Sequence, residues 1–258
     1  MIKLFYIIIF LIGIQLNNFD EHCIHQKFDF VDLDNLGNVY IVKNDQVKKY
    51  NNKGALIKIF SNKRLGSISS IDVSNPLRIL LFYKDQSSIL FLDSQLSEQN
   101  DKIDLNQINL EQSALACTSI NNSVWLFNKQ NCELIRLDKS RFINTGNLNN
   151  LLSLELNPVF MLEYNNFLYL SDPLIGILIF DIFGTYYKTL PIKSVNKFNI
   201  VAGKIYYLKD NKLFAYDLKK YENEVFEILP DNLSSIVHTD NFQLKLYNDS
   251  ICISKKNE

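Results

Sequence analysis

The sequence predicts an all-β repeat fold, a six-bladed β-propeller, and three observations support this prediction. An apolar stretch runs five times into an Asn or Asp and turns, at Asn51, Asp93, Asp138, Asp181 and Asp217. These residues are 42, 45, 43 and 36 positions apart, and a period near 40 with strands inside each unit is typical of propeller blades. Helix signals are nearly absent, while short runs of β-branched and aromatic residues bounded by turn residues recur throughout.

A further strand is expected ahead of the aromatic strand of each unit, which brings the number of units to six. These inner strands are expected in the segments Phe28–Leu33, Ile68–Val73, Ala114–Ser119, Val159–Tyr164, Phe198–Val201 and Ile236–Thr239. Several of the predicted strands are apolar on both faces, which fits strands buried between neighbouring blades. The segments Ser97–Gln112 and Asn144–Asn157 are interpreted as long loops, and Leu148–Leu156 could hold a short helix.

Asparagine is abundant and glycine is scarce, with only eight glycines in 258 residues. Asparagine tolerates the left-handed backbone region better than most other non-glycine residues. We therefore expect asparagine at many turn positions where glycine is usual.

The sixth unit is truncated, because the chain ends after the strand Ser250–Ser254 with no room for another. An unpaired edge there would favour aggregation. We expect Glu21–Lys27 to close the ring as the outer strand of the last blade, antiparallel to Ser250–Ser254. This pairing would make Cys23 and Cys252 neighbours. A disulfide between them is allowed in an exported protein, and two reduced cysteines are the alternative.

Residues 1–20 are interpreted as a signal peptide or a short N-terminal anchor, and residues 21–258 as a single propeller domain. Leu4–Leu16 forms an apolar run behind Lys3. This run is shorter than the roughly 20 residues of a membrane-spanning helix and suits the hydrophobic region of a signal peptide. We expect export to the periplasm or cell envelope, with membrane association only through this N-terminal segment.

Composition argues against nucleic acid as a partner, since the formal net charge is −1 and the sequence pI is about 6.3. The chain has three histidines, His22, His25 and His238, and no Gly-rich phosphate loop or metal-binding cysteine spacing. We therefore predict no catalytic residue from the sequence, and whether the protein is an enzyme stays open at this stage.

Polar residues on the predicted inner strands are the candidates for ligand binding, because those strands line the central channel of a propeller. The candidates are Asp29, Asp72, Glu163, Asn199 and His238, with Asp32, Thr118 and Asp240 beside them. Carboxylate and amide oxygens around one axis could hold a calcium ion. The alternative is a set of solvated groups around a water-filled tunnel, and no cofactor is expected in that case.

Three aromatic residues, Phe183, Tyr186 and Tyr187, surround the turn that begins at Asp181. Aromatic side chains are enriched at the cores of protein interfaces, so an exposed set here would bind a partner. Packing between blades is the alternative.

Two segments resemble known propellers. The stretch Gly37–Gly54, with Gly-Asn-Val-Tyr-Ile-Val followed by Lys-Tyr-Asn-Asn-Lys-Gly, resembles the repeats of NHL-type and TolB-like six-bladed propellers, and Tyr169–Asp181 matches a similar blade. The chain is most similar to bacterial exported propellers of unassigned function. Within that group, sugar-lactone hydrolases use a Glu, Asn and Asp set around a channel calcium, and Glu163 and Asn199 could take part in such a set.

The function expected from these observations is an exported binding or scaffold module for another envelope protein. Loops on one rim would recognise that partner, and the protein would catalyse no reaction. The alternative that the resemblance implies is a calcium-dependent lactonase-type hydrolase with its site in the central channel. Because one fold supports many activities, the fold alone does not choose between them.

Overall fold

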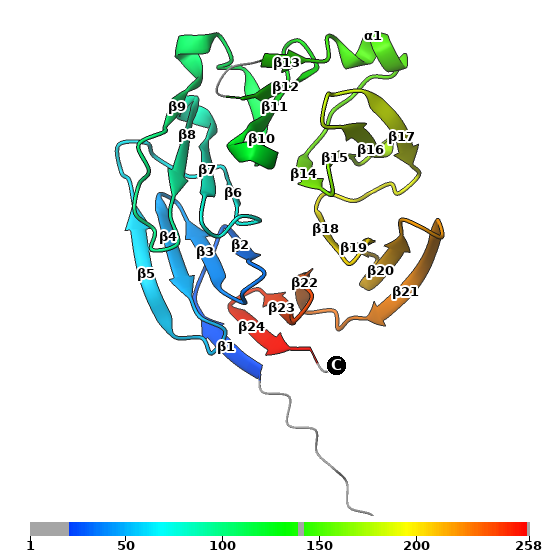
Figure 1. Ribbon diagram of the computed structural model, residues 1–258. Helices are drawn as coiled ribbons and strands as arrows, with labels where there is room; N and C mark the ends of the chain where they lie inside the picture. Colours follow the sequence, from blue (N-terminus) through cyan, green and yellow to red (C-terminus); the bar gives the residue numbers. More distant parts are fainter. Residues whose placement is uncertain (1–20, 139–141, 257–258) are drawn as a thin grey trace, which may run out of the picture.

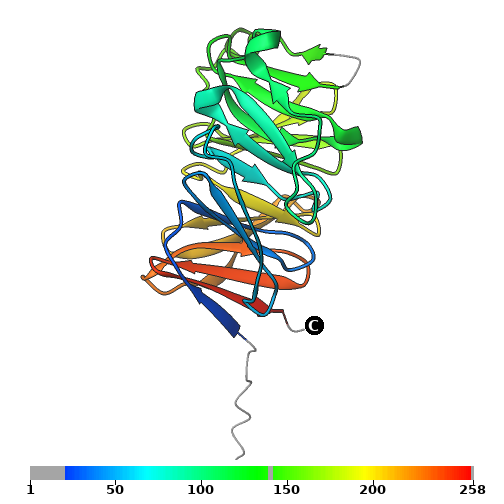
Figure 2. The ribbon, with the colours of Figure 1, turned by 90° about the vertical axis from the view of Figure 1, so that its left-hand side faces the viewer.

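The computed structural model describes residues 21–138 and 142–256 and shows a six-bladed β-propeller. Six four-stranded antiparallel sheets are arranged in a ring around a central axis (Figure 1). Seen from the side, the ring is flattened into a disc (Figure 2). The predicted fold class is confirmed. Among the described residues, no helix is long and apolar enough to cross a membrane.

In each blade the strands are ordered from the inner strand outward. Blade 1 contains β2 (Phe30–Leu33), β3 (Val39–Lys43), β4 (Gln46–Tyr50) and β5 (Leu56–Ser61). Blade 2 contains β6 (Ser70–Asp72), β7 (Ile79–Tyr83), β8 (Ser88–Leu92) and β9 (Ile103–Asp104). Blade 3 contains β10 (Ser113–Thr118), β11 (Val124–Asn128), β12 (Glu133–Leu137) and β13 (Phe142–Asn144).

Blade 4 contains β14 (Phe160–Tyr164), β15 (Phe167–Asp172), β16 (Gly176–Asp181) and β17 (Tyr186–Leu190). Blade 5 contains β18 (Phe198–Val201), β19 (Lys204–Lys209), β20 (Lys212–Asp217) and β21 (Glu222–Ile228). Blade 6 contains β22 (Leu233–His238), β23 (Phe242–Tyr247), β24 (Ser250–Lys255) and β1 (Glu21–His25).

The remaining elements are short. The one α-helix of the described chain, α1 (Leu148–Leu152), lies within the segment predicted to hold one. Three 3₁₀ helices cover Lys84–Gln86, Leu105–Ile108 and Ile120–Asn122. The segment Ser97–Gln112, expected as a loop, also includes the two-residue outer strand β9, which is too short to give a periodic signal in the sequence.

In blades 1, 2, 4 and 5 the repeated Asn or Asp lies at the end of the third strand and begins the turn to the outer strand. Asn51 Oδ1 accepts hydrogen bonds from the backbone N–H groups of Lys53 and Ala55 at 3.0 and 2.9 Å. Asp93 and Asp181 accept equivalent bonds, and Asp217 accepts from the backbone N–H groups two and three residues further on. The side chain replaces a backbone acceptor in a turn of this type, so the sequence repeat has a local physical cause.

Asparagine takes the turn positions expected of it. Seven of the 15 described non-glycine residues with positive φ are asparagines. Asn165 and Asn166, with φ of 48° and 64°, form the two-residue turn between β14 and β15. Two consecutive left-handed residues match the twist of a hairpin, so asparagine provides here what a pair of glycines would otherwise provide.

The core lies between the blades. Each of six apolar clusters joins the facing sheets of two neighbouring blades, and several middle strands, such as β7 and β11, are buried along their whole length. The cluster between blades 6 and 1 has twelve buried members, whereas that between blades 5 and 6 has four: Leu213, Leu229, Leu233 and Ile236. The contact between blades 5 and 6 is therefore the least apolar of the ring.

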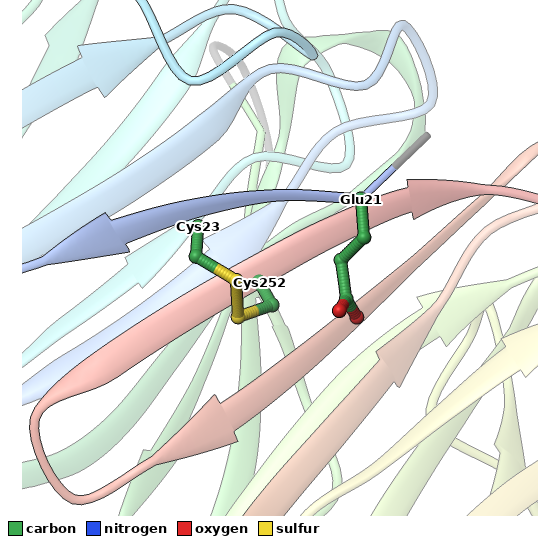
Figure 3. Close-up of side chains that lie close together, drawn as sticks. All are labelled: Glu21, Cys23 and Cys252. Atoms are coloured by element: carbon green, nitrogen blue, oxygen red, sulfur yellow. A yellow bond between two sulfur atoms is a disulfide. The ribbon is translucent and has the colours of Figure 1, made fainter. Parts of the chain in front are cut away.

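The ring is closed by the N-terminal strand, as the sequence predicted. β1 pairs antiparallel with β24, and Cys23 lies opposite Cys252. A disulfide joins these two cysteines, whose Cα atoms are 4.1 Å apart (Figure 3). Cys117 and Cys132 are buried free thiols. The bond therefore fastens the first described strand to the last one across the seam of the ring.

Candidate functional site

Several polar residues of the inner strands form bonds from one blade to another. Asp72 on β6 accepts bonds from the backbone N–H and the hydroxyl of Thr118 on β10, at 2.8 and 2.7 Å. Asn199 on β18 donates from Nδ2 to the backbone oxygen of His238 on β22 at 2.6 Å. Lys197 and Asp32, in blades 5 and 1, form an ion pair of 3.3 Å.

Glu163, on β14, has the densest set of such contacts. Its two oxygens accept from the Ser119 hydroxyl at 2.5 Å, the Ile120 backbone N–H at 3.0 Å and the Trp125 indole N–H at 2.7 Å, all in blade 3. Arg136 completes the network by donating from Nε to the Ser119 oxygen at 2.8 Å. Glu163 thus joins blade 4 to blade 3 and provides the partner that the buried indole N–H needs.

We expect Glu163→Ala to lower the free energy of unfolding by about 2–3 kcal/mol. The substitution leaves the fully buried Trp125 indole N–H and the Ile120 N–H without their acceptor, and an unsatisfied buried donor costs about 1–3 kcal/mol. Urea denaturation of both proteins measures the difference. Asp29→Ala is the matched control, because the Asp29 bonds to Lys43 and to the Asn44 backbone N–H are both exposed, so water replaces them and a smaller loss of about 1 kcal/mol is expected. Equal losses for the two variants would contradict the role of Glu163.

Asp29 lies just before β2 rather than within it. Its carboxylate accepts from the Asn44 backbone N–H at 2.7 Å and pairs with the Lys43 ammonium at 2.5 Å. These bonds, with the backbone one first, lower the pKa of Asp29 below its ordinary value. Asp29 therefore holds the turn between β3 and β4.

His238, at the end of β22, is buried in an aromatic cluster between blades 5 and 6. Its ring stacks on Tyr206 of β19 at a centroid distance of 5.0 Å and meets the edge of Phe226 of β21 at 5.8 Å. Burial, and then the positive charges of Lys256 and Lys245, lower the pKa of His238 to about 3. The imidazole is neutral near neutral pH, and Nδ1 has no hydrogen-bond partner in the described chain.

A polar cleft of about 340 Å³ opens where hairpin turns of blades 2 and 3 meet Glu163 of blade 4. Ser74, Asn75, Thr118 and Asn121 line it together with Arg78. The Arg78 guanidinium lies over the Phe91 ring, 3.3 Å from its centroid, and donates twice to Asp101. The cleft therefore combines two predicted channel residues, Glu163 and Thr118, with an arginine that the sequence reasoning missed.

The channel residues do not fit the calcium set that the resemblance implies. Both oxygens of Glu163 accept donors from blade 3, whereas the Asn199 amide bonds to blade 6 on the other side. The one group of three metal-ligand side chains found in the described chain is Glu21, Cys23 and Cys252 (Figure 3). The sulfurs of that group are joined in the disulfide. Ligand binding by the five candidate residues stays a prediction.

The aromatic residues around the Asp181 turn are largely exposed. Phe183 and Tyr187 have 66% and 59% of their surface accessible, while Tyr186 is half-buried against Phe180. Lys188 lies over the rings of Tyr187 and Tyr221, with Nζ 5.3 and 3.9 Å from their centroids. We call Phe183, Tyr187 and Tyr221 the aromatic surface. Lys188 joins Tyr187 of blade 4 to Tyr221 of blade 5, whereas Phe183 lies on the blade 4 turn whose Gly184 approaches Thr145 of blade 3.

A β-bulge recurs in three outer strands and places a large apolar residue at the surface. The unpaired residues are Ile57 in β5, Tyr187 in β17 and Phe226 in β21. All three are exposed. A bulge turns its side chain away from the regular alternation and protects a sheet edge from further pairing. Ile57 and Tyr187 both lie six positions after their turn residue, Asn51 or Asp181.

Comparison with known proteins supports the class that the geometry defines, a six-bladed propeller. No protein-family model matches the chain, and no curated protein matches it in sequence. Virginiamycin B lyase from Staphylococcus aureus is similar in structure, with a TM-score of 0.58 and 14% identity over 88% of this chain and 80% of that one.

Two further structures are similar over part of their length. The extracellular domain of BT4673 from B. thetaiotaomicron, named as a hybrid two-component system, has a TM-score of 0.57 and 12% identity, covering 88% of this chain and 33% of that one. PorZ of Porphyromonas gingivalis, a surface component of the type-IX secretion system, has a TM-score of 0.50 and 15% identity, covering 89% and 34%. At these identities the likeness establishes the fold, and the chain spans about a third of these two proteins.

Proposed function

We propose that this protein is an exported propeller that acts as a binding module for another protein of the cell envelope. The observation that carries the proposal is the aromatic surface, where Phe183, Tyr187 and Tyr221 are each more than half exposed. Exposed clusters of aromatic residues on a soluble domain are typical of interaction sites. Asp72, Glu163 and Asn199, in contrast, are engaged in bonds between blades.

Two features support export to the periplasm or cell envelope. The apolar segment Leu4–Leu16 has the length of a signal-peptide hydrophobic region, and it lies outside the described residues. The Cys23–Cys252 disulfide is of a kind that persists in oxidising compartments. Propellers of similar fold include an extracellular domain and a surface component of a secretion system, which is consistent with this location.

Site-specific photo-crosslinking tests the binding role. A photoreactive phenylalanine analogue at Tyr187 is expected to crosslink one defined protein in cells, and Phe183→Ser in the same chain is expected to reduce the yield severalfold. The matched control places the analogue at Leu36, which is equally exposed on the β2–β3 turn of blade 1. The same crosslinks from both positions, or none from Tyr187, would overturn the proposal.

A further inference from the structure

A second cleft, of about 410 Å³, lies at the seam between blades 6 and 1. We call it the seam cleft. One wall is the segment that follows β1, with Gln26 and Lys27, and the other is the face of blade 1 that carries Ile41, Lys43 and Lys48. Neither wall contributes to the aromatic surface.

The donors of the seam cleft are arranged for an oxygen acceptor. Gln26 Oε1 accepts from Lys48 Nζ at 3.1 Å and from the Tyr50 hydroxyl at 3.3 Å, which fixes the amide orientation. Gln26 Nε2, in consequence, is buried without any hydrogen-bond partner in the described chain. A buried N–H group of this kind is costly unless an acceptor is supplied.

Charge in the seam cleft favours an anion. Asp29 pairs with Lys43, while Asp45, which also lines the cleft, accepts a hydrogen bond from the Ser61 hydroxyl and keeps its negative charge, so Lys27 and Lys48 together exceed Asp45 by one positive charge. Lys27 and Lys48 have no ion-pair partner in the part of the chain that the structure describes. Two ammonium groups and one amide donor thus remain for a negatively charged oxygen group.

One exposed apolar side chain, Ile59, lies beside these donors, outside the lining of the cleft. Ile41, Lys48 and Ile59 lie opposite one another on neighbouring strands of blade 1, and opposed residues share a face of the sheet. Ile41 is buried in the cleft wall, while Ile59 on the outer strand is 44% exposed. A ligand held by Lys48 can therefore place an apolar group along Ile59.

We propose that the seam cleft is a binding site for a carboxylate that is attached to an apolar group. Lys48, Lys27 and the Gln26 amide bind the carboxylate, and Ile41 and Ile59 contact the apolar part. The carboxyl end of an apolar peptide and a fatty-acid-like anion both have this chemistry. This site goes beyond the proposed function, since it needs neither the aromatic surface nor an envelope partner.

The site depends on ring closure. Gln26 lies three residues after Cys23, so its wall is held in place by β1 and by the disulfide to Cys252. Reduction that releases β1 removes that wall. The ligand in turn stabilises the closed ring, because anything that binds only the closed form shifts the equilibrium toward it.

Calorimetric titration of the oxidised full-length protein tests the site with two probes, hexanoate and the peptide acetyl-Ala-Val-Val with a free carboxyl end. Saturable binding of at least one probe is expected, and the corresponding amide of that probe should not bind. Lys48→Gln and Gln26→Leu are expected to weaken binding about tenfold, as for the loss of one charge-assisted hydrogen bond. Binding of hexanoate alone indicates a fatty-acid-like ligand, and binding of the peptide alone indicates a protein carboxyl end.

Lys58→Gln is the matched control. Lys58 lies on the same blade, opposite Lys49 rather than Lys48, and outside the cleft, so this variant should bind as the wild type does. Reduced protein should bind more weakly than oxidised protein. The proposal is overturned if neither probe saturates, if the amides bind equally well, or if Lys58→Gln and Lys48→Gln weaken binding to the same extent.

Discussion

Replacement of Cys23 and Cys252 by serine is expected to lower the free energy of unfolding by about 5 kcal/mol. The disulfide joins residues 229 positions apart, and the chain-entropy model gives this stabilisation for a loop of such length. A loss of this size is comparable to the whole stability of many single domains. We therefore expect the double variant to be marginally folded near body temperature.

Urea denaturation of the oxidised wild type, the reduced wild type and the double variant provides the measurement. The reduced wild type and the variant should unfold at similar urea concentrations, both well below that of the oxidised protein. Reductant should leave the variant unchanged, which controls for effects on the buried thiols Cys117 and Cys132. A difference below about 1 kcal/mol would mean that the β1–β24 pairing and its apolar contacts close the ring unaided.

The ring and its closure could be predicted from the sequence because they depend on local and repeated signals. Asn51, Asp93, Asp181 and Asp217 mark the same turn in four blades through bonds to their own neighbouring backbone. One strand is missing from the last unit, and the segment Glu21–Lys27 ahead of the first unit is predicted to supply it; the observed strand is Glu21–His25. The outer strand β9 has only two residues, which is too short to show a periodic pattern, so the sequence predicts a loop for its segment.

The roles of the channel residues could not be predicted, because they depend on contacts between blades. Glu163 and Ser119 are 44 residues apart, and no pattern in one unit reveals which donor from the neighbouring unit will face it. Residue type placed Glu163 near the channel but could not show that its oxygens are occupied. The bulge residues Ile57 and Tyr187 were missed as a set, although their equal distance from the turn residue was a usable signal.

Acid should weaken the contact between blades 5 and 6 through His238. Unfolded histidine takes up a proton near pH 6.5, whereas the folded pKa of His238 is lowered to about 3. Between these two pKa values the unfolded state binds more protons than the folded state. The contribution of His238 to the free energy of unfolding is therefore fully present above pH 6.5 and is lost as the pH decreases toward 3. The apolar cluster at this contact has only four buried members, so little else compensates for a charge placed there.

The environment of His238 opposes protonation from several elements. Tyr206 and Phe226 cover the ring, and Lys245 and Lys256 bring positive charge toward it. Glu227 forms an ion pair of 3.3 Å with Lys245, and the negative charge of Asp240 favours the charged form of Lys256. These two carboxylates partly offset the lysines but form no hydrogen bond to the imidazole in the described chain.

Replacement of His238 by phenylalanine should therefore remove a large part of the acid sensitivity. The loss of stability between about pH 7.5 and about pH 5 should be smaller in His238→Phe than in the wild type by about 2 kcal/mol. Phenylalanine keeps the ring contacts with Tyr206 and Phe226, and His238→Gln provides a second non-titrating variant if the larger ring disturbs folding. His25→Gln, which removes an exposed histidine from β1, is the control and should follow the wild type. Urea denaturation at the two pH values measures each difference, and parallel pH profiles for the wild type and both His238 variants would show that this histidine does not control acid stability.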